Sequence, residues 1–312
     1  MRSAGVVLAV TTACVFAAGS VTACAAPAGG ARAAGATGTA AVSFPAHGRS
    51  YYLSLGDSLS RGVQPDAGGS DAATRQGYPD QLQAALRRGT AGLRLVKLGC
   101  SGETTATMMR GGRCRYGGGS QLAAADAFLR AHRGRTALVT IDIGANDPNS
   151  CTQGFSAPRI TAGDLARCLN SQFRATLANL AAILARLRAA GGSAVPVIGM
   201  NYYVPELAGW LDGHQGKLIA AVSERLAAAY NQLLAGVYRH YGARVADVFG
   251  AFHSADFGAQ MRLPGKGILP RNVAAVCQWT WICAAPPRGP DEHANKAGYA
   301  VIARAFLRAA RT

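Results

Sequence analysis

A serine at the end of an apolar run is the residue of this 312-residue chain best placed for covalent chemistry. The run Tyr51-Tyr52-Leu53-Ser54-Leu55 stops at Gly56-Asp57-Ser58-Leu59-Ser60, which presents Ser58 at a strand end. A serine hydroxyl attacks a carbonyl carbon only when a base takes its proton and hydrogen-bond donors stabilise the resulting oxyanion. The chain must therefore supply a base and donors close to Ser58.

Three other segments offer such groups. His293 lies in Pro290-Asp291-Glu292-His293, just before a helical pattern, and histidine is the commonest general base. Gly102 follows an apolar run and is free to bring its backbone N–H close to a ligand. Asn146 follows another apolar run and offers a side-chain amide. Serine, glycine, asparagine and histidine thus occur in that order, at three strand ends and one late loop.

This order resembles the SGNH hydrolases, also called the GDSL family, over roughly Ser50 to Thr312. The resemblance implies that Ser58 is the nucleophile and His293 its base. It also implies an oxyanion hole made by the N–H groups of Ser58 and Gly102 and the side-chain amide of Asn146. The signature Gly-x-Ser-x-Gly is absent from the chain, which counts against an α/β-hydrolase. No cofactor and no metal are expected.

The acid that would orient His293 departs from the common family pattern. Most members carry it three residues before the histidine, where this chain has Pro290, and the nearest aspartate is Asp291. Residues two apart in an extended segment point to the same side, so the Asp291 side chain could reach Nδ1 of His293. The alternative is that a backbone carbonyl orients the imidazole while Asp291 caps the following helix. Either group would fix the tautomer and stabilise the imidazolium.

The elements that must position these residues alternate between apolar strands and helices. The pattern predicts strands at Tyr51 to Leu55, Leu93 to Leu98, Ala137 to Ile143, Val195 to Met200 and Arg244 to Phe249. It predicts helices at Pro79 to Arg88, Gln121 to His132, Phe173 to Ala190, Leu218 to His240 and Lys296 to Arg311.

Apolar strands separated by helices indicate a parallel sheet covered on both faces. The family resemblance implies a flavodoxin-like, three-layer α/β/α sandwich with five strands in the order 2-1-3-4-5. In such sheets ligands bind beyond the carboxyl ends of the strands, and Ser58, Gly102 and Asn146 all follow carboxyl ends. The motif and the fold thus predict the same place for the site.

The first 48 residues are expected to precede one folded domain, residues 49–312. Residues 1–24 begin with Met1-Arg2 and continue with an apolar stretch, which is typical of a secretory signal. Val21-Thr22-Ala23-Cys24 resembles a bacterial lipobox, in which Cys24 would be lipidated and would hold the protein in the cell envelope. Ordinary signal-peptidase cleavage is the alternative and would give an extracellular protein. Residues 25–48 are rich in small residues and are expected to form a flexible leader.

The cysteines predict disulfides. Without Cys14 and Cys24, six of the eight cysteines remain, and an even number in an exported chain indicates a disulfide framework. Pairing between sequence neighbours is the connectivity that we expect: Cys100 with Cys114, Cys151 with Cys168, and Cys277 with Cys283. The chain has no Cys-x-x-Cys or His-rich spacing, so we do not expect these cysteines to bind a metal.

The net charge of +16 comes from basic residues scattered along the chain. A nucleic-acid binder should show a basic stripe or an aromatic-basic alternation, and neither is present, so no nucleic-acid partner is expected. The charge indicates a cationic exported surface that is weakly drawn to anionic polymers or lipid headgroups. We expect a monomeric esterase or lipase whose substrate is a lipid or an acylated small molecule or polysaccharide. An acetyl esterase or acyltransferase on envelope polysaccharide, and a non-catalytic binding lipoprotein, are the alternatives.

Overall fold

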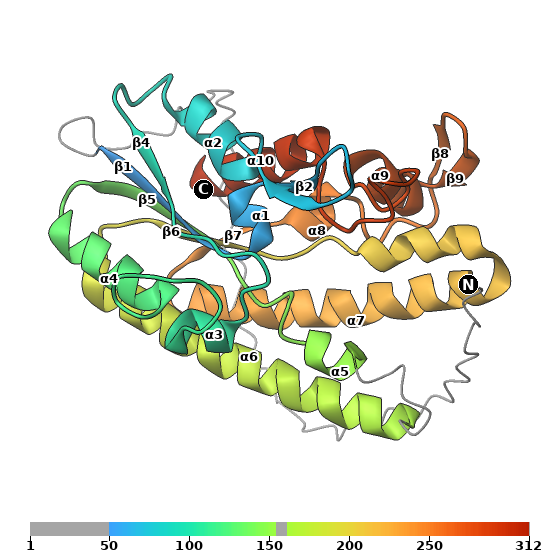
Figure 1. The fold of residues 1–312 in the computed structure, drawn as a ribbon, viewed down its shortest axis with the longest axis horizontal. Coiled ribbons are helices and arrows are strands. Elements are labelled where there is room, and N and C mark those ends of the chain that lie inside the picture. The colour runs from blue at the N-terminus through green and yellow to red at the C-terminus, as the bar shows by residue number, and fades with distance from the viewer. Residues whose placement is uncertain (1–49, 154–160, 312) are drawn as a thin grey trace, which may run out of the picture.

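A five-stranded parallel sheet forms the centre of the computed structural model, which describes residues 50–153 and 161–311 (Figure 1). Its strands are β1 (Tyr51–Gly56), β4 (Arg94–Lys97), β5 (Thr136–Asp142), β6 (Val197–Met200) and β7 (Arg244–Ala246). They lie in the order β4-β1-β5-β6-β7, which is the expected 2-1-3-4-5 when the strands of this sheet are counted along the chain. The expected signal peptide and leader, with Cys24, lie outside the described residues.

Helices cover both faces of the sheet and complete the predicted α/β/α sandwich (Figure 1). One face is covered by α2 (Tyr78–Leu86) and α10 (Lys296–Arg311), which pack against each other. The other face is covered by α4 (Gln121–Ala131), α6 (Ala162–Gly191) and α7 (Gly213–His240). Both layers are required because β5 is buried at every position, so neither of its faces can be left to water.

Shorter elements line the carboxyl edge of the sheet or connect the layers. The helices among them are α1 (Ser58–Arg61), α3 (Thr105–Arg110), α5 (Asn149–Gln153), α8 (Val248–Ala251), α9 (Arg271–Trp279) and the 3-10 helix η2 (Pro205–Asp212). Two antiparallel hairpins pair β2 (Val63–Pro65) with β3 (Asp71–Ala73) and β8 (Gln260–Leu263) with β9 (Gly267–Pro270). Within the described ranges, no helix is long and apolar enough to cross a membrane.

Several boundaries differ from the sequence prediction, and two of them have clear local causes. The last sheet strand ends at Ala246 and not at Phe249, because the Asp247 side chain accepts a hydrogen bond from the Gly250 N–H and starts α8. Helix α6 begins eleven residues before Phe173, because Thr161 and Asp164 form a capping box at its N-terminus. The apolar periodicity marks where a helix is buried, whereas capping residues mark where it begins.

Disulfides link the loops at three places in the described part of the chain. Cys100 is bonded to Cys114, Cys151 to Cys168, and Cys277 to Cys283. These are the neighbour pairs expected from the sequence. The first closes the loop after β4, the second joins α5 to α6, and the third closes the loop after α9.

Candidate active site

The turn after β1 presents Ser58 as the first residue of α1, at the carboxyl end of the strand. Gly56 makes this turn possible, because its φ of +134° disfavours other residues. A Cβ at position 56 would also lie 2.1 Å from the carbonyl oxygen of Asp142. Ser58 is partly exposed, whereas Asp57 and Leu59 on either side are buried. The serine is therefore the residue of this turn that can meet a ligand.

Asp57 fixes the turn. Its Oδ1 accepts a hydrogen bond of 3.0 Å from the N–H of Leu59, so it caps α1. Burial raises the pKa of Asp57 to about 6. Because its Oδ1 is bound by the N–H of the turn itself, we assign Asp57 to holding the serine turn in place, and not to the base.

Two buried polar side chains under the turn were not identified from the sequence. Asp142 accepts hydrogen bonds from the N–H of Ser60 at 3.1 Å and from the hydroxyl of Tyr78. Gln121 brackets the end of β1, because it accepts from the N–H of Gly56 at 2.6 Å and donates to its carbonyl at 2.9 Å. Burial raises the pKa of Asp142 well above its usual value, and the Asp57 charge adds to this. An aspartate inside the apolar run of β5 was the available sequence signal.

His293 lies in the loop before α10, buried, with its imidazole held by Asp291. Nδ1 of His293 lies 3.0 Å from Oδ1 of Asp291, and the same oxygen accepts the backbone N–H of His293 at 2.8 Å. The side-chain alternative for the orienting acid is thus the one that the geometry favours. With a proton on Nδ1 facing the carboxylate, Nε2 is the nitrogen free to act as a base.

The acidic groups near His293 and the burial of its imidazole have opposite effects on its pKa. Burial alone would lower the pKa of His293, but the Asp291 hydrogen bond and the charges of Asp291, Asp71 and Glu292 outweigh it, and the net pKa is raised. For Asp291, burial favours a higher pKa, yet its hydrogen bonds to His293 and the imidazolium charge lower it overall. Burial raises the pKa of Asp57 in the serine turn, and the charge on His293 opposes this effect.

Gly102 and Asn146 are brought together by hydrogen bonds between their loops. Gly102 has a φ of +71° and follows Cys100, whose N–H donates to the Gly56 carbonyl at 3.0 Å. The Asn146 side-chain amide donates to the Glu103 carbonyl at 3.0 Å. One amide hydrogen is thereby used to fix Asn146, and the second is left for another acceptor. Ser58, Gly102 and Asn146 therefore follow three adjacent strands, β1, β4 and β5.

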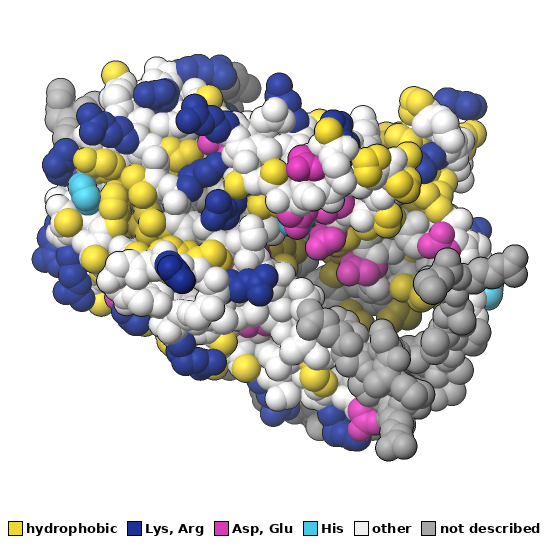
Figure 2. Space-filling view, in the orientation of Figure 1, with side chains coloured by type: hydrophobic (Ala, Val, Ile, Leu, Met, Phe, Trp, Pro, Cys, Tyr) yellow, Lys and Arg dark blue, Asp and Glu magenta, His cyan; other side chains and the backbone are white. Residues whose placement is uncertain are grey.

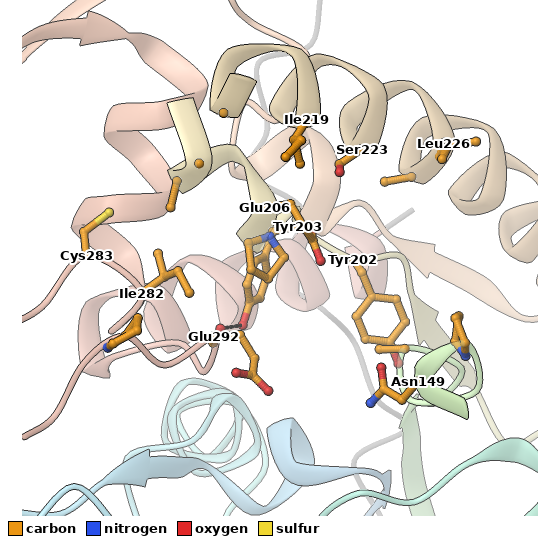
Figure 3. A pocket seen from close by; sticks show the side chains of 18 of the residues that line it. Asn149, Tyr202, Tyr203, Glu206, Ile219, Ser223, Leu226, Ile282, Cys283 and Glu292 are labelled. Carbon is orange, nitrogen blue, oxygen red and sulfur yellow. Dashed lines mark hydrogen bonds between the residues drawn. The ribbon is translucent and has the colours of Figure 1, made fainter. Parts of the chain in front are cut away.

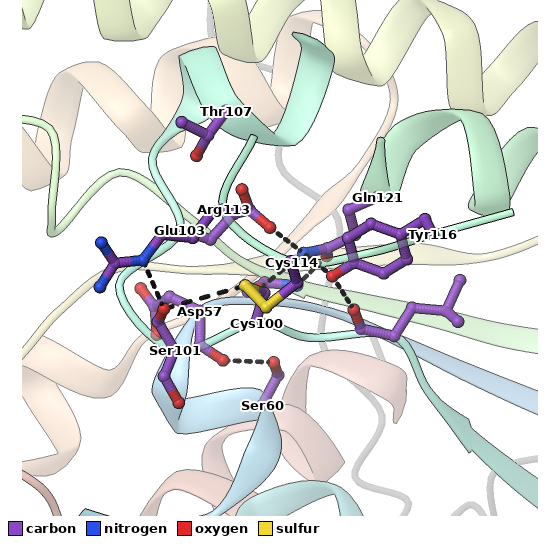
Figure 4. Close-up of a disulfide and its surroundings, with 12 residues drawn as sticks. Asp57, Ser60, Cys100, Ser101, Glu103, Thr107, Arg113, Cys114, Tyr116 and Gln121 are labelled. Carbon is purple, nitrogen blue, oxygen red and sulfur yellow. Dashed lines mark hydrogen bonds between the residues drawn. A yellow bond between two sulfur atoms is a disulfide. The ribbon is translucent and has the colours of Figure 1, made fainter. Parts of the chain in front are cut away.

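The loop that carries Gly102 is held rigidly (Figure 4). Figure 4 shows the Cys100–Cys114 disulfide next to Asp57 and Ser60 of the serine turn. The Arg113 side chain donates from Nε to the Ser101 carbonyl at 3.0 Å, which closes the loop from its outer side. In the turn after β5, Asp147 accepts from the N–H of Thr105 at 3.0 Å and so joins the start of α3 to the Asn146 turn.

A further acid, Asp71, approaches His293 from the β2–β3 hairpin. Its Oδ1 lies 3.6 Å from Nδ1 of His293, beside the Asp291 carboxylate. Potential ligand atoms of Asp71, Asp291 and His293 lie within 4.8 Å of one another, a spacing that could admit a cation. Two of these three residues, Asp291 and His293, are close because they are hydrogen-bonded to each other. The sequence analysis did not single out Asp71, because nothing in the sequence shows which loop faces the histidine.

A groove of about 1320 Å³ is lined at one end by Asn146, Pro290 and Glu292, whereas Ser58, Gly102 and His293 are not among its lining residues (Figure 3). It begins at Asn146 and at Glu292, the neighbour of His293, and runs between η2 and α7. Ile219, Ser223 and Leu226 project into it from α7, and Ile282 lies across from them. Figure 2 shows acidic side chains gathered beside a hollow on a face that is otherwise rich in lysine and arginine.

Comparison with solved structures identifies the same fold in several lipolytic enzymes. An extracellular lipase from Streptomyces rimosus has a TM-score of 0.55 and 19% identity, over 83% of this chain and 99% of that one. Phospholipase A1 from Streptomyces albidoflavus has a TM-score of 0.53 and 18% identity, over 84% and 99%. A lipase from a goat rumen metagenome has a TM-score of 0.53 and 16% identity, over 84% and 97%. At these identities the likeness shows the fold alone.

Comparison by sequence is more specific about the family. No curated protein matches the chain. A sequence profile of the GDSL-like lipase/acylhydrolase family matches residues 54–301, a span that includes Ser58, Gly102, Asn146 and His293. Because that span is most of the chain, this protein belongs to the GDSL-like lipase/acylhydrolase family.

Proposed function

We propose that this protein is an exported carboxylic ester hydrolase that works through a covalent acyl-enzyme on Ser58. The observation that carries the proposal is the hydrogen bond between Asp291 and Nδ1 of His293. It holds the imidazole in the tautomer that a base for a serine needs. Family membership supports the reaction class.

The proposed reaction has two halves. In the first, His293 takes the proton of Ser58 as the hydroxyl attacks the ester carbonyl, and then gives it to the leaving alcohol. In the second, water attacks the acyl-enzyme in the same way and releases the acid. The oxyanion of each tetrahedral intermediate would be bound by the N–H groups of Ser58 and Gly102 and by Nδ2 of Asn146. Asp291 would stabilise the imidazolium that forms each time.

The groove supports an ester with a long apolar part. Its walls include Phe173, Leu211, Ile219, Leu226 and Ile282, and it begins at the proposed oxyanion donor Asn146. Its volume exceeds the range of about 300–1,000 Å³ typical of small-molecule sites, and an acetyl group would fill little of it. We therefore propose that the acyl chain or another apolar part of the substrate lies along α7.

Labelling with a fluorophosphonate tests the chemistry. We expect the probe to modify Ser58 in the wild-type protein, and we expect Ser58→Ala to lose both labelling and hydrolysis of p-nitrophenyl esters. Ser60→Ala is a matched control, because Ser60 is buried in the same turn and donates to the Asp57 carbonyl. Full activity of Ser58→Ala would rule out the mechanism.

Chain length distinguishes the substrate classes. A panel of p-nitrophenyl esters from acetyl to long-chain acyl, run beside acetylated xylan and a phospholipid, should show kcat/KM rising with chain length. Leu226→Trp, which narrows the groove, should lower activity on the long chains more than on acetyl esters. A profile limited to acetyl esters would favour the acetyl esterase or acyltransferase.

Export rests on the N-terminal sequence and is supported by the disulfides. We propose that Cys24 is lipidated and holds the protein in the cell envelope. Cys24→Ser should then release the protein from the membrane fraction and remove the acyl mass. A membrane fraction and mass unchanged by this substitution would favour ordinary cleavage and secretion.

A further inference from the structure

A second carboxylate stands beside the imidazole of His293, on a different element from Asp291. Asp291 reaches His293 from two residues earlier in the same loop, whereas Asp71 comes from the start of β3, at the hairpin of residues 63–73. Both present Oδ1 to Nδ1, at 3.0 Å for Asp291 and 3.6 Å for Asp71. The imidazole is 9% exposed, and the Asp71 side chain is 55% exposed. Asp71 therefore adds charge beside Nδ1 from the solvent side.

Asp291 alone gives the imidazole limited support. Its Oδ1 is shared between two donors, the backbone N–H and Nδ1 of His293. This sharing follows from the position of Asp291 two residues before the histidine, because the short loop places both donors at one oxygen. Oδ1 of Asp291 is thus divided between two donors, and a second carboxylate beside the ring can add to the stabilisation of the imidazolium.

The hairpin that carries Asp71 is attached to the histidine loop by several contacts, which fix the position of Asp71 beside His293. Nε1 of Trp281 donates to Oε1 of Gln64 at 3.4 Å, and the Trp281 backbone N–H donates to the His293 carbonyl at 3.0 Å. Gly69, at the hairpin tip, lies so close to Pro287 that a Cβ would stand 2.1 Å from its carbonyl oxygen. Tyr299 of α10 donates to the Val63 carbonyl at 2.8 Å.

We propose that Asp71 is a second positioning acid for His293, which shares with Asp291 the task of stabilising the imidazolium. The inference rests on the proposed function, in which His293 becomes a cation during each acyl transfer. A contact of 3.6 Å is longer than a hydrogen bond to a neutral imidazole, but it becomes an attraction when the ring gains charge. Asp71 thus acts mainly in the transition state.

The charges around the ring agree with this assignment. Asp291, Asp71 and Glu292 raise the pKa of His293 against its burial, and Asp57 faces it from the serine turn. Burial raises the pKa of Asp71 despite the His293 charge, and the neighbouring acids Asp291 and Glu292 raise it further. Two carboxylates this close disfavour each other's ionisation, and a cation that forms beside them relieves this repulsion.

The test is a double-mutant cycle on p-nitrophenyl ester hydrolysis. Asp71→Asn should lower kcat about five- to tenfold, because the side chain is half exposed and its charge is screened. Asp291→Asn should lower kcat about 10²-fold, less than the roughly 10⁴-fold that loss of the acid costs in other serine triads. In the double variant kcat should fall about 10⁴-fold, more than the product of the two single losses, because no carboxylate is then left at Nδ1 of His293.

A pH profile separates positioning from structural support. Asp71→Asn should move the acid limb of kcat/KM to lower pH, because removing a negative charge lowers the pKa of His293. Asp71→Glu should restore most of kcat. The matched control is Asp66→Asn on the same hairpin, which removes a charge while Oδ1 still accepts the Gly68 and Ser70 N–H bonds; its kcat and acid limb should stay at the wild-type values.

Each result decides the inference. If Asp71→Asn matches Asp66→Asn in kcat and acid limb, or if the double variant loses only the product of the single losses, the second acid is refuted. Fluorophosphonate labelling of Ser58 in the wild type keeps this outcome separate from failure of the proposed function, because a protein that is labelled and active without using Asp71 refutes the present inference alone.

Discussion

The oxyanion hole can be tested most sharply at Asn146. Its amide donates one hydrogen to the Glu103 carbonyl at 3.0 Å and has a second one to offer. Asn146→Ala removes both. Loss of one oxyanion donor lowers kcat by about 10²- to 10³-fold, which corresponds to about 2.7–4 kcal/mol. The lost bond to Glu103 is partly buried and should cost about 1 kcal/mol of unfolding free energy.

The kinetic signature distinguishes an oxyanion donor from a structural residue. The negative charge exists only in the transition state, so kcat should fall while KM on a p-nitrophenyl ester changes little. Asn146→Asp should be slower than Asn146→Ala, because a carboxylate of the same shape repels the oxyanion. Urea unfolding of each variant would show that the proteins are folded during the assay.

The matched control is Asn149→Ala. Asn149 donates from Nδ2 to Oδ1 of Asn146 at 3.3 Å, so it helps to orient the amide without replacing it. We expect less than a tenfold loss of kcat for this variant. If Asn146→Ala keeps kcat within threefold of the wild type, or if it raises KM and leaves kcat unchanged, the assignment of Asn146 to the oxyanion hole is wrong.

Three further predictions concern the base, the support of the turn and the Gly102 loop. Because the pKa of His293 is raised and the base must be neutral, kcat/KM should fall as pH drops, with a midpoint above 6.5; a midpoint at or below 6.5 would contradict this. Tyr78→Phe removes a donor to buried Asp142 and should lower the unfolding free energy by about 1–3 kcal/mol in urea titrations; an unchanged value would contradict that role. Replacing both Cys100 and Cys114 by serine should cost about 3 kcal/mol of stability and also lower kcat.

The disulfide prediction has an internal control. The Cys151–Cys168 pair is separated by 17 residues and the Cys100–Cys114 pair by 14, so the chain-entropy model gives them nearly equal effects on stability. The Cys100–Cys114 bond lies beside Asp57 and Ser60 of the serine turn (Figure 4), whereas the Cys151–Cys168 bond joins α5 to α6. Serine replacements at both pairs should therefore destabilise alike, whereas kcat should fall more for the Cys100–Cys114 variant. Equal losses of kcat would mean that this bond contributes only stability.

The sequence predicted those parts of the fold that repeat along the chain. Apolar runs separated by amphipathic helices predicted the parallel sheet, and the family resemblance predicted its strand order. The end of the last strand was not predicted correctly, because the side chains of Asp247 and Asn201 accept hydrogen bonds from the first N–H groups of α8 and so start a helix there. Ends of elements depend on individual side chains, and a window average does not resolve them.

The same limit explains which parts of the candidate site the sequence could predict. Ser58, Gly102 and Asn146 follow strand ends, so a correct sheet brings them to one edge. Asp142 and Gln121 act through contacts 82 and 65 residues along the chain, and a polar residue in a buried strand was the only available sign of the first.

Asp71 shows why a short motif can be incomplete. The acid two residues before His293 could be predicted from spacing, because both residues belong to one loop. The approach of Asp71 depends on three separate attachments of the hairpin, through Gln64, Gly69 and Val63, and none of these has a sequence signal. Because Asp291 shares one oxygen between two donors, a second carboxylate from outside the motif can add to the stabilisation of the His293 imidazolium. The energetic coupling of Asp71 and Asp291 would therefore measure how far the unusual spacing is compensated by the fold.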